Sequence, residues 1–307
     1  MVLSMLVRRT ALRRVPLTKP IPTIYSRTLM TLPSFSLEGK TCTVTGAARG
    51  LGKEILTAFS MSGAKGACID LSLSSDQQSV AHIKSHISSS TPFKSSEPSY
   101  EPELRAYACD VTSESQVQET FQSIIKDFGK LDVLVTAAGI VENWEAEKYP
   151  FLCAKEAGRY WIKEEMRGNL IFVGRYLVRG LYIYHTQSKA AVHLLSNSLA
   201  TEVSSYPLSP SLLTMHKQPL PSQWGPKGIR VNSLSPGYIK TDLVKDLLDR
   251  EGRHLEENWV IDIPLGRLAH PSEFQGTAVW MASEASSHLN GSNIVVDGGY
   301  CCYQLAE

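Results

Sequence analysis

Short apolar runs alternate with longer stretches of mixed polarity along most of this chain. Each run holds three or four residues, of which at least half are apolar, which is typical of a strand buried on both faces of a parallel sheet. These runs predict strands at residues 42–45, 67–69, 106–109, 133–136, 170–173, 231–234 and 294–296. The mixed stretches predict helices at residues 53–62, 76–87, 114–128, 190–203 and 272–283. The alternation therefore favours a single α/β domain, built as a doubly wound parallel sheet with helices on both faces.

Two segments break this alternation and predict loops. Residues 88–103 are rich in Ser, Pro and Glu, a composition typical of a surface connection. Residues 204–223 have neither a helical nor a strand period, so they predict an exposed loop. This second segment contains Pro207, Pro210, Pro219 and Pro221.

The first 37 residues differ from the rest of the chain in charge. No Asp or Glu occurs before Glu38, whereas basic residues occur at Arg8, Arg9, Arg13, Arg14, Lys19 and Arg27. An acid-free, Arg-rich start is typical of a mitochondrial presequence, and the alternative is a disordered basic tail on a cytoplasmic protein. We therefore expect residues 1–37 to lie outside the fold and residues 38–307 to form the domain.

Composition narrows the class of protein. The formal net charge of +1 gives no sign of a nucleic-acid partner, and no apolar run approaches the ~20 residues that span a bilayer. The six cysteines are scattered without a C-x-x-C pair, so we expect free thiols and predict no metal site. The 43% of apolar residues is ordinary for a globular protein, so the ligand has to be inferred from motifs.

The most informative motif is a glycine-rich turn between the first predicted strand and the first predicted helix. It runs Thr45-Gly46-Ala47-Ala48-Arg49-Gly50-Leu51-Gly52. Glycines let the backbone turn tightly and approach a ligand closely, and the start of a helix points free N–H groups at an anion. A strand, a glycine turn and a helix start in this order predict a cradle for a phosphate group.

The spacing T-G-x-x-x-G-x-G resembles the short-chain dehydrogenase/reductase family, whose members bind NAD or NADP on a Rossmann-type sheet. Further motifs follow in the family's order: Asp110-Val111, Thr136-Ala137-Ala138-Gly139, Pro236-Gly237-Tyr238-Ile239-Lys240-Thr241 and Asp297-Gly298-Gly299. The resemblance implies a homo-oligomer. It also implies cofactor contacts by Thr45, Gly46, Arg49, Gly50, Leu51, Gly52, Asp70, Asp110, Val111, Gly139, Lys189, Pro236, Gly237, Ile239 and Thr241.

Asp70, at the end of the second predicted strand, bears on the choice of cofactor. A carboxylate at this position accepts hydrogen bonds from the adenosine ribose hydroxyls and repels a 2′-phosphate. Arg49 in the glycine turn favours the opposite choice, but no Arg follows Asp70. We therefore predict NAD as the cofactor and NADP as the weaker ligand.

The catalytic residues depart from the family pattern. The family uses Y-x-x-x-K, in which the Lys binds the ribose and lowers the pKa of the Tyr that exchanges a proton with the substrate. Lys189 fits the Lys position, but His185 occupies the Tyr position and Tyr184 lies one residue away, about 100° around a helix. The family's catalytic Ser has no counterpart in residues 174–184, and residues 141–169 look too short to carry the family's helix Asn. Tyr184 and Lys189 are the candidate catalytic pair, with His185 as the alternative acid-base group.

Residues 203–223 have the character of an insertion. Without them, Glu202 would run into Trp224 and the joined flanks would form a smooth family sequence. The segment is therefore either a retained intron or a divergent loop.

Residues 138–144 and 297–300 resemble the fungal polyol dehydrogenases, a group that contains D-arabinitol dehydrogenase, mannitol dehydrogenase and sorbose reductase. This resemblance implies an NAD(P)-dependent oxidoreductase that interconverts a sugar alcohol and a ketose, here with a damaged catalytic centre. The alternative is a nucleotide-binding pseudoenzyme or a mis-spliced product without dehydrogenase activity.

Overall fold

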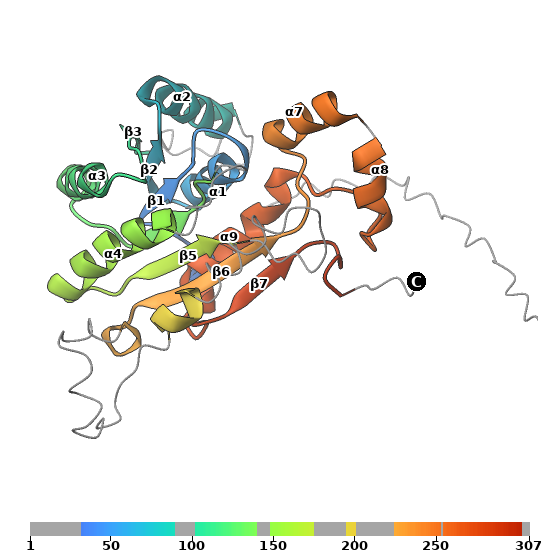
Figure 1. Cartoon of the computed structure of the whole chain (residues 1–307). Coiled ribbons are helices and arrows are strands. Elements are labelled where there is room, and N and C mark those ends of the chain that lie inside the picture. The colour runs from blue at the N-terminus through green and yellow to red at the C-terminus, as the bar shows by residue number, and fades with distance from the viewer. Residues whose placement is uncertain are drawn as a thin grey trace, which may run out of the picture. The chain divides into compact units, whose positions relative to one another are not determined.

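The computed structural model describes residues 32–89, 102–139, 148–174, 195–200, 224–252 and 254–302. Their centre is a seven-stranded parallel sheet with the order β3-β2-β1-β4-β5-β6-β7 (Figure 1). This arrangement confirms all seven predicted strands and the doubly wound α/β fold. The strands are β1 (Thr41–Thr45), β2 (Lys65–Asp70), β3 (Leu104–Ala108), β4 (Val133–Thr136), β5 (Asn169–Val173), β6 (Arg230–Pro236) and β7 (Asn293–Val296).

The apolar runs are continuous because successive side chains of a strand enter two different cores. Along β4, Val133 and Val135 belong to one apolar cluster, whereas Leu134 belongs to the other. Helices α1, α2 and α9 supply the first cluster, and α3, α4 and the helical residues 195–200 supply the second. Their bounds are α1 (Gly50–Met61), α2 (Leu73–Ser89), α3 (Glu114–Phe128), α4 (Lys148–Lys163) and α9 (Gln275–Ala282).

Helix α3 has the bounds that the sequence predicts because residues at both of its ends cap it well. The Ser113 hydroxyl accepts the backbone N–H of Gln116 at 3.5 Å, and Gly129 follows the helix with a φ of 79°. Helix α1 begins three residues before its predicted start, at Gly50, where no side chain caps the helix. The capping residues explain why the two predictions differ in accuracy.

Helix α4 was missed by the sequence interpretation, which predicted no helix within residues 141–169; the shortening proposed for this segment stays a prediction. The helix buries Leu152, Ala157 and Trp161 against the second face of the sheet, and the Trp161 indole N–H donates to the carbonyl of Leu131 at 2.7 Å. Pro150 lies in the first turn, where a missing N–H breaks no helical hydrogen bond.

The prediction also missed two helices that follow β6, α7 (Asp242–Glu251) and α8 (His254–Ile261). Figure 1 shows this pair set apart from the helices that cover the sheet. The predicted helix at 272–283 is a 3-10 turn, Pro271–Phe274, that continues into α9. None of the helices in the described ranges is both long and apolar enough to cross a bilayer.

The folded unit starts before the predicted boundary at residue 38. It includes the described residues from Leu32 onward, among which Leu37 is fully buried and donates its backbone N–H to the carbonyl oxygen of Ser62 at 2.9 Å. Leu37 therefore belongs to the fold and not to the segment that was predicted to lie outside it. Residues 1–31 and the predicted insertion at 203–223 lie outside the described residues.

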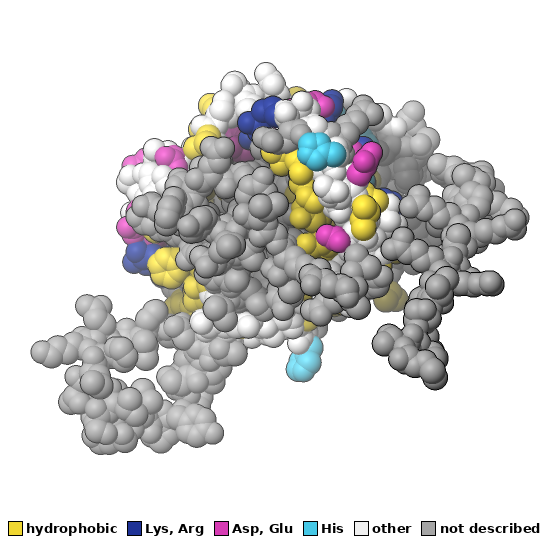
Figure 2. Space-filling view, turned by 45° about the vertical axis from the view of Figure 1, so that its right-hand side comes forward, with side chains coloured by type: hydrophobic (Ala, Val, Ile, Leu, Met, Phe, Trp, Pro, Cys, Tyr) yellow, Lys and Arg dark blue, Asp and Glu magenta, His cyan; other side chains and the backbone are white. Residues whose placement is uncertain are grey.

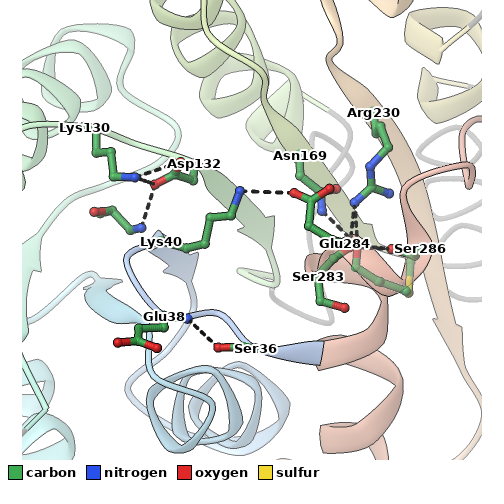
Figure 3. A network of polar contacts seen from close by, with 12 residues as sticks. Ser36, Glu38, Lys40, Lys130, Asp132, Asn169, Arg230, Ser283, Glu284 and Ser286 are labelled. Atoms are coloured by element: carbon green, nitrogen blue, oxygen red, sulfur yellow. Dashed lines mark hydrogen bonds and ion pairs between the residues drawn. The ribbon is translucent and has the colours of Figure 1, made fainter. Parts of the chain in front are cut away.

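Polar contacts join the amino-terminal ends of the central strands to their neighbours (Figure 3). The Asp132 carboxylate, before β4, accepts the Thr41 N–H of β1 at 2.8 Å and pairs with Lys130 at 3.1 Å. The Asn169 side-chain amide and the Arg230 guanidinium, at the starts of β5 and β6, both donate to the carbonyl of Met281. These contacts stabilise the sheet at its amino edge, whereas the candidate binding site lies in the loops at the opposite, carboxyl edge.

Candidate cofactor site at the carboxyl edge of the sheet

The glycine turn joins β1 to α1 in the conformation that its sequence predicts. Gly46 and Gly50 have φ values of 69° and 56°, in the left-handed region that favours glycine. A Cβ on Gly46 would lie 2.7 Å from the Cα of Ala138, and one on Gly52 would overlap the carbonyl oxygen of Gly46. The turn therefore needs glycine both for its backbone conformation and for its close packing. The first N–H groups of a helix have no partner within the helix, so the start of α1 can receive a phosphate group.

The loops after β4 and β6 meet this turn. Thr45, at the end of β1, accepts the backbone N–H of Ala138 on its Oγ1 at 3.2 Å. A Cβ placed on Gly50 would contact the Cγ2 of Thr241 at 3.7 Å, so the loop after β6 lies against the start of α1. Three segments that are distant in sequence therefore converge at one point of the carboxyl edge.

The loop after β6 is held from several sides. The Gly237 N–H donates to Val296 at 3.0 Å, and Ile239 is buried and forms a β-bridge with Ala269. Thr241 caps α7, because its hydroxyl accepts the N–H of Val244 at 3.3 Å. Pro236 is the last residue of β6, so the predicted P-G-x-x-x-T segment starts at the end of this strand and reaches the glycine turn at Thr241.

Asp70 ends β2 and turns its carboxylate toward the glycine turn. Its Oδ2 accepts the N–H of Ala48 at 3.1 Å, and its Oδ1 accepts the N–H of Leu71 at 2.9 Å. Each carboxylate oxygen has a second lone pair, so the group is fixed in place and retains acceptor capacity for ligand hydroxyls. The structure therefore places the predicted discriminating residue beside the predicted phosphate cradle.

The remaining predicted cofactor residues also follow strands at this edge. Asp110, after β3, accepts the N–H of Thr112 at 2.9 Å and Val111 packs against the second apolar cluster. Gly139 is exposed after β4. Arg49 is an exposed residue directly before α1, and Leu51 packs partly into the first apolar cluster. Tyr184, His185 and Lys189 lie outside the described residues, so their geometry stays a prediction.

Two features of the site were missed by the sequence interpretation. One is Asp76 on α2, a fully buried carboxyl whose Oδ2 accepts the N–H of Asp70 at 3.1 Å. The other is an aromatic cluster beside the loop after β6, in which Tyr238 stacks on Trp259 at 4.6 Å and meets Tyr300 edge-on at 5.5 Å. Burial raises the pKa of the Tyr300 phenol to about 12, so it stays neutral. Acidic residues are ordinary in the first turn of a helix, so nothing in the sequence marked Asp76 as buried.

These features define a class of protein. In a doubly wound sheet the ligand binds at the carboxyl edge where the strand order reverses, which here is between β1 and β4. A glycine turn at that point and a carboxylate at the end of β2 are typical of a dinucleotide-binding protein.

The family follows from two matches that together cover almost the whole domain. Residues 40–211 match a family model described as short chain dehydrogenase, and residues 212–301 match one described as Enoyl-(Acyl carrier protein) reductase. The chain belongs to the short-chain dehydrogenase family.

Three curated fungal relatives match along nearly their full length. A Yarrowia lipolytica protein named "Probable NADP-dependent mannitol dehydrogenase" is 32% identical over 94% of this chain and 95% of its own. D-arabinitol 2-dehydrogenase [ribulose-forming] of Scheffersomyces stipitis is 31% identical over 89% of this chain and 97% of its own. The NADH-dependent L-xylulose reductase of Ambrosiozyma monospora is 31% identical over 88% of this chain and 97% of its own. The resemblance to fungal polyol dehydrogenases is thereby confirmed.

A solved structure agrees with this assignment. The crystal structure of a short-chain type dehydrogenase/reductase from Mycobacterium marinum has a TM-score of 0.71 and is 29% identical, covering 88% of this chain and 98% of that chain. The single-domain architecture of the family is therefore preserved in this chain.

Proposed function

We propose that this protein is an NAD(P)-dependent oxidoreductase of the short-chain dehydrogenase type that interconverts a small sugar alcohol and a ketose. The convergence of the glycine turn, Asp70 and the loop after β6 at one point of the sheet carries the proposal. The names of the three fungal relatives, which describe polyol and ketose chemistry, support the substrate class.

The described residues fit a dinucleotide. The space that a Cβ on Gly46 or Gly52 would fill is needed for tight packing of the turn, and the start of α1 can receive the pyrophosphate. Asp70 can accept both adenosine ribose hydroxyls on its remaining lone pairs. When bound, the cofactor supplies the nicotinamide that exchanges a hydride with the substrate carbon.

The preference for NAD over NADP rests on Asp70. Its carboxylate lies at the end of β2, where a 2′-phosphate would meet a negative charge in place of a cation. The relatives do not decide the matter, since one is named for NADP and another for NADH. We therefore propose NAD as the preferred cofactor on electrostatic grounds.

Catalysis is proposed to be impaired. By resemblance, Lys189 holds the nicotinamide ribose and Tyr184, or His185 in its place, moves the proton of the substrate hydroxyl. Tyr184 is one residue out of register with Lys189, and residues 174–184 contain no Ser or Thr. The second candidate function, a nucleotide-binding pseudoenzyme or a mis-spliced product, is favoured by the same observation.

Two measurements on the purified chain test the proposal separately. Calorimetry with NAD and NADP measures the cofactor site, and NADH formation from D-arabinitol, mannitol and sorbitol measures the chemistry. NAD binding with measurable turnover of a polyol supports the oxidoreductase, whereas NAD binding without turnover supports the pseudoenzyme. Absence of binding by both cofactors would refute the proposed function in either form.

We further propose that residues before about residue 32 direct the protein to mitochondria and are removed on import. The proposal rests on the acid-free, Arg-rich start of the chain. Cell fractionation combined with sequencing of the mature amino terminus tests it. A protein recovered outside mitochondria with an intact Met1 would favour the cytoplasmic alternative.

A further inference from the structure

A buried carboxyl group lies directly behind the cofactor-discriminating Asp70. Asp76, in the first turn of α2, is 0% exposed, and its Oδ2 accepts the backbone N–H of Asp70 at 3.1 Å. The thiol of Cys68, two residues before Asp70 on β2, points at the other oxygen with an Sγ–Oδ1 distance of 3.8 Å. Both carboxyl oxygens of Asp76 are therefore directed at the strand end that carries Asp70.

The same face of α2 also holds the glycine turn. Ser79, three residues after Asp76, donates its hydroxyl to the carbonyl oxygen of Ala48. The N–H of Ala48 in turn donates to the Asp70 carboxylate at 3.1 Å. Because residues three apart lie on one face of a helix, a single face of α2 fixes the turn and the end of β2 together.

We propose that Asp76 is a second specificity residue of the adenosine site, which positions Asp70 and adds its own negative charge against a 2′-phosphate when it ionises. The proposal rests on the proposed function, because it needs a dinucleotide at Asp70. With Asp76 neutral, a 2′-phosphate meets one carboxylate; with Asp76 ionised, it meets two. The ribose hydroxyls of NAD carry no charge, so the discrimination against NADP should increase as pH rises.

The surroundings of Asp76 place the pKa of its carboxyl in the pH range over which cofactor binding can be measured. Burial, with the charge of Asp70 as the second cause, raises the pKa of the Asp76 carboxyl to about 7. The Cys68 thiol acts in the opposite direction as a hydrogen-bond donor, and burial raises the pKa of that thiol far above neutrality. On α1, the positive charge of Lys53 lowers the pKa of the Cys68 thiol, against the larger effect of burial.

The charges on β3, the other strand packed against α2, are directed elsewhere. Arg105 pairs with Asp127 at 3.2 Å, and the Tyr107 hydroxyl donates to the same carboxylate at 2.7 Å. Asp127 belongs to α3, which covers the opposite face of the sheet. Asp70 is therefore the main charged group whose proximity sets the ionisation of Asp76.

The test compares the dissociation constants of NAD and NADP across about pH 6–8.5 for the full chain, Asp76→Asn and Glu119→Gln. Asparagine keeps an oxygen for the Asp70 N–H but cannot ionise. Glu119 is an exposed carboxylate on α3, so its variant loses a charge without touching the site. The 2′-phosphate of NADP itself titrates near pH 6, and this contribution is common to all three proteins.

We expect the ratio of the NADP constant to the NAD constant to rise with pH by about 3–10-fold more in the wild type and Glu119→Gln than in Asp76→Asn, the effect of one added charge several ångströms away. Identical pH profiles for the wild type and Asp76→Asn would overturn the inference while NAD binding upheld the proposed function. If neither cofactor bound, both would fall together.

A measurement on the wild type covers the case in which Asp76→Asn fails to fold. The ¹³C shift of the Asp76 carboxyl carbon, followed against pH, reports its ionisation directly. Saturating NADP should raise the midpoint of that titration more than saturating NAD does, because binding and ionisation are reciprocally linked. A midpoint near that of an ordinary Asp, unchanged by NADP, would overturn the inference.

Discussion

At the scale of single residues, the candidate cofactor site depends on the Asp70 carboxylate, which binds backbone N–H groups and still has lone pairs left for a ligand. Each Asp70 oxygen accepts one backbone N–H, from Ala48 on Oδ2 and from Leu71 on Oδ1. This arrangement fixes the direction of the remaining lone pairs before a ligand arrives, which reduces the ordering cost of binding. Asp70, which its position in the sequence identifies as the cofactor-discriminating residue, therefore also has the geometry to accept ligand hydroxyls.

Replacing Asp70 by Ala should weaken NAD binding about 10–150-fold, since hydrogen bonds to a charged group contribute roughly 1.5–3 kcal/mol. NADP binding should change less, because the substitution also removes the repulsion of the 2′-phosphate. Calorimetry with both cofactors measures the two effects. Tighter binding of NADP than of NAD by the wild type would contradict the role of Asp70.

The raised pKa of Asp76 should also make the free energy of unfolding depend on pH. A carboxyl whose pKa is raised from 3.8 to about 7 in the folded state contributes stability that is present below about pH 4 and is lost as pH rises through about 7. Asp76→Asn should remove this part of the pH dependence, up to about 4 kcal/mol at about 1.4 kcal/mol per pKa unit. Urea unfolding of both proteins between about pH 4 and 8 measures it, and parallel curves would contradict it.

At the scale of elements, strands were predictable and several helices were not. Parallel strands buried on both faces appear in the sequence as short runs rich in apolar residues, and all seven were found. Helix α3 was found with its bounds because Ser113 and Gly129 cap it. Helices α7 and α8 are short, with 10 and 8 residues, so few turns are available in which a helical period can show in the sequence. The burial of Asp76 is a tertiary effect with no local signal.

Helix α4 offers a test of whether the segment read as shortened is a working part of the core. Trp161 is fully buried, and both Gly168 and the Leu131 carbonyl contact its indole. Trp161→Ala should lower the free energy of unfolding by about 3–5 kcal/mol, as for other buried aromatic residues. Phe151→Ala on the same helix, where the side chain is 44% exposed, should cost less than about 1 kcal/mol. Equal effects of the two variants would show that α4 does not pack as described.

At the scale of the whole molecule, the carboxyl edge combines parts with different chemical tasks. The glycine turn, Asp70 and the loop after β6 are joined by contacts among described residues and agree with the family pattern. The surface carries charges of both signs over the described part of the face in Figure 2, in keeping with the formal net charge of +1. The departures from the family concern proton transfer, at Tyr184 and His185 and in the Ser-free residues 174–184. We therefore expect these departures to affect catalysis more than cofactor binding, although Lys189 serves both by resemblance.

We accordingly predict that NAD binding outlasts catalysis. Loss of a positioned acid-base group costs about 10²–10⁴-fold in rate, so polyol oxidation should fall well below the common enzyme range of ~1–10³ s⁻¹.

His185→Tyr restores the family spacing to Lys189 but supplies no Ser, so it should recover little turnover and leave the NAD dissociation constant within about twofold. Deleting residues 203–223 should likewise preserve NAD binding if that segment is an insertion. The measurements are NADH formation and NAD calorimetry on the same preparations. Full turnover by the wild type that disappears in Tyr184→Phe would instead assign proton transfer to Tyr184 despite its register.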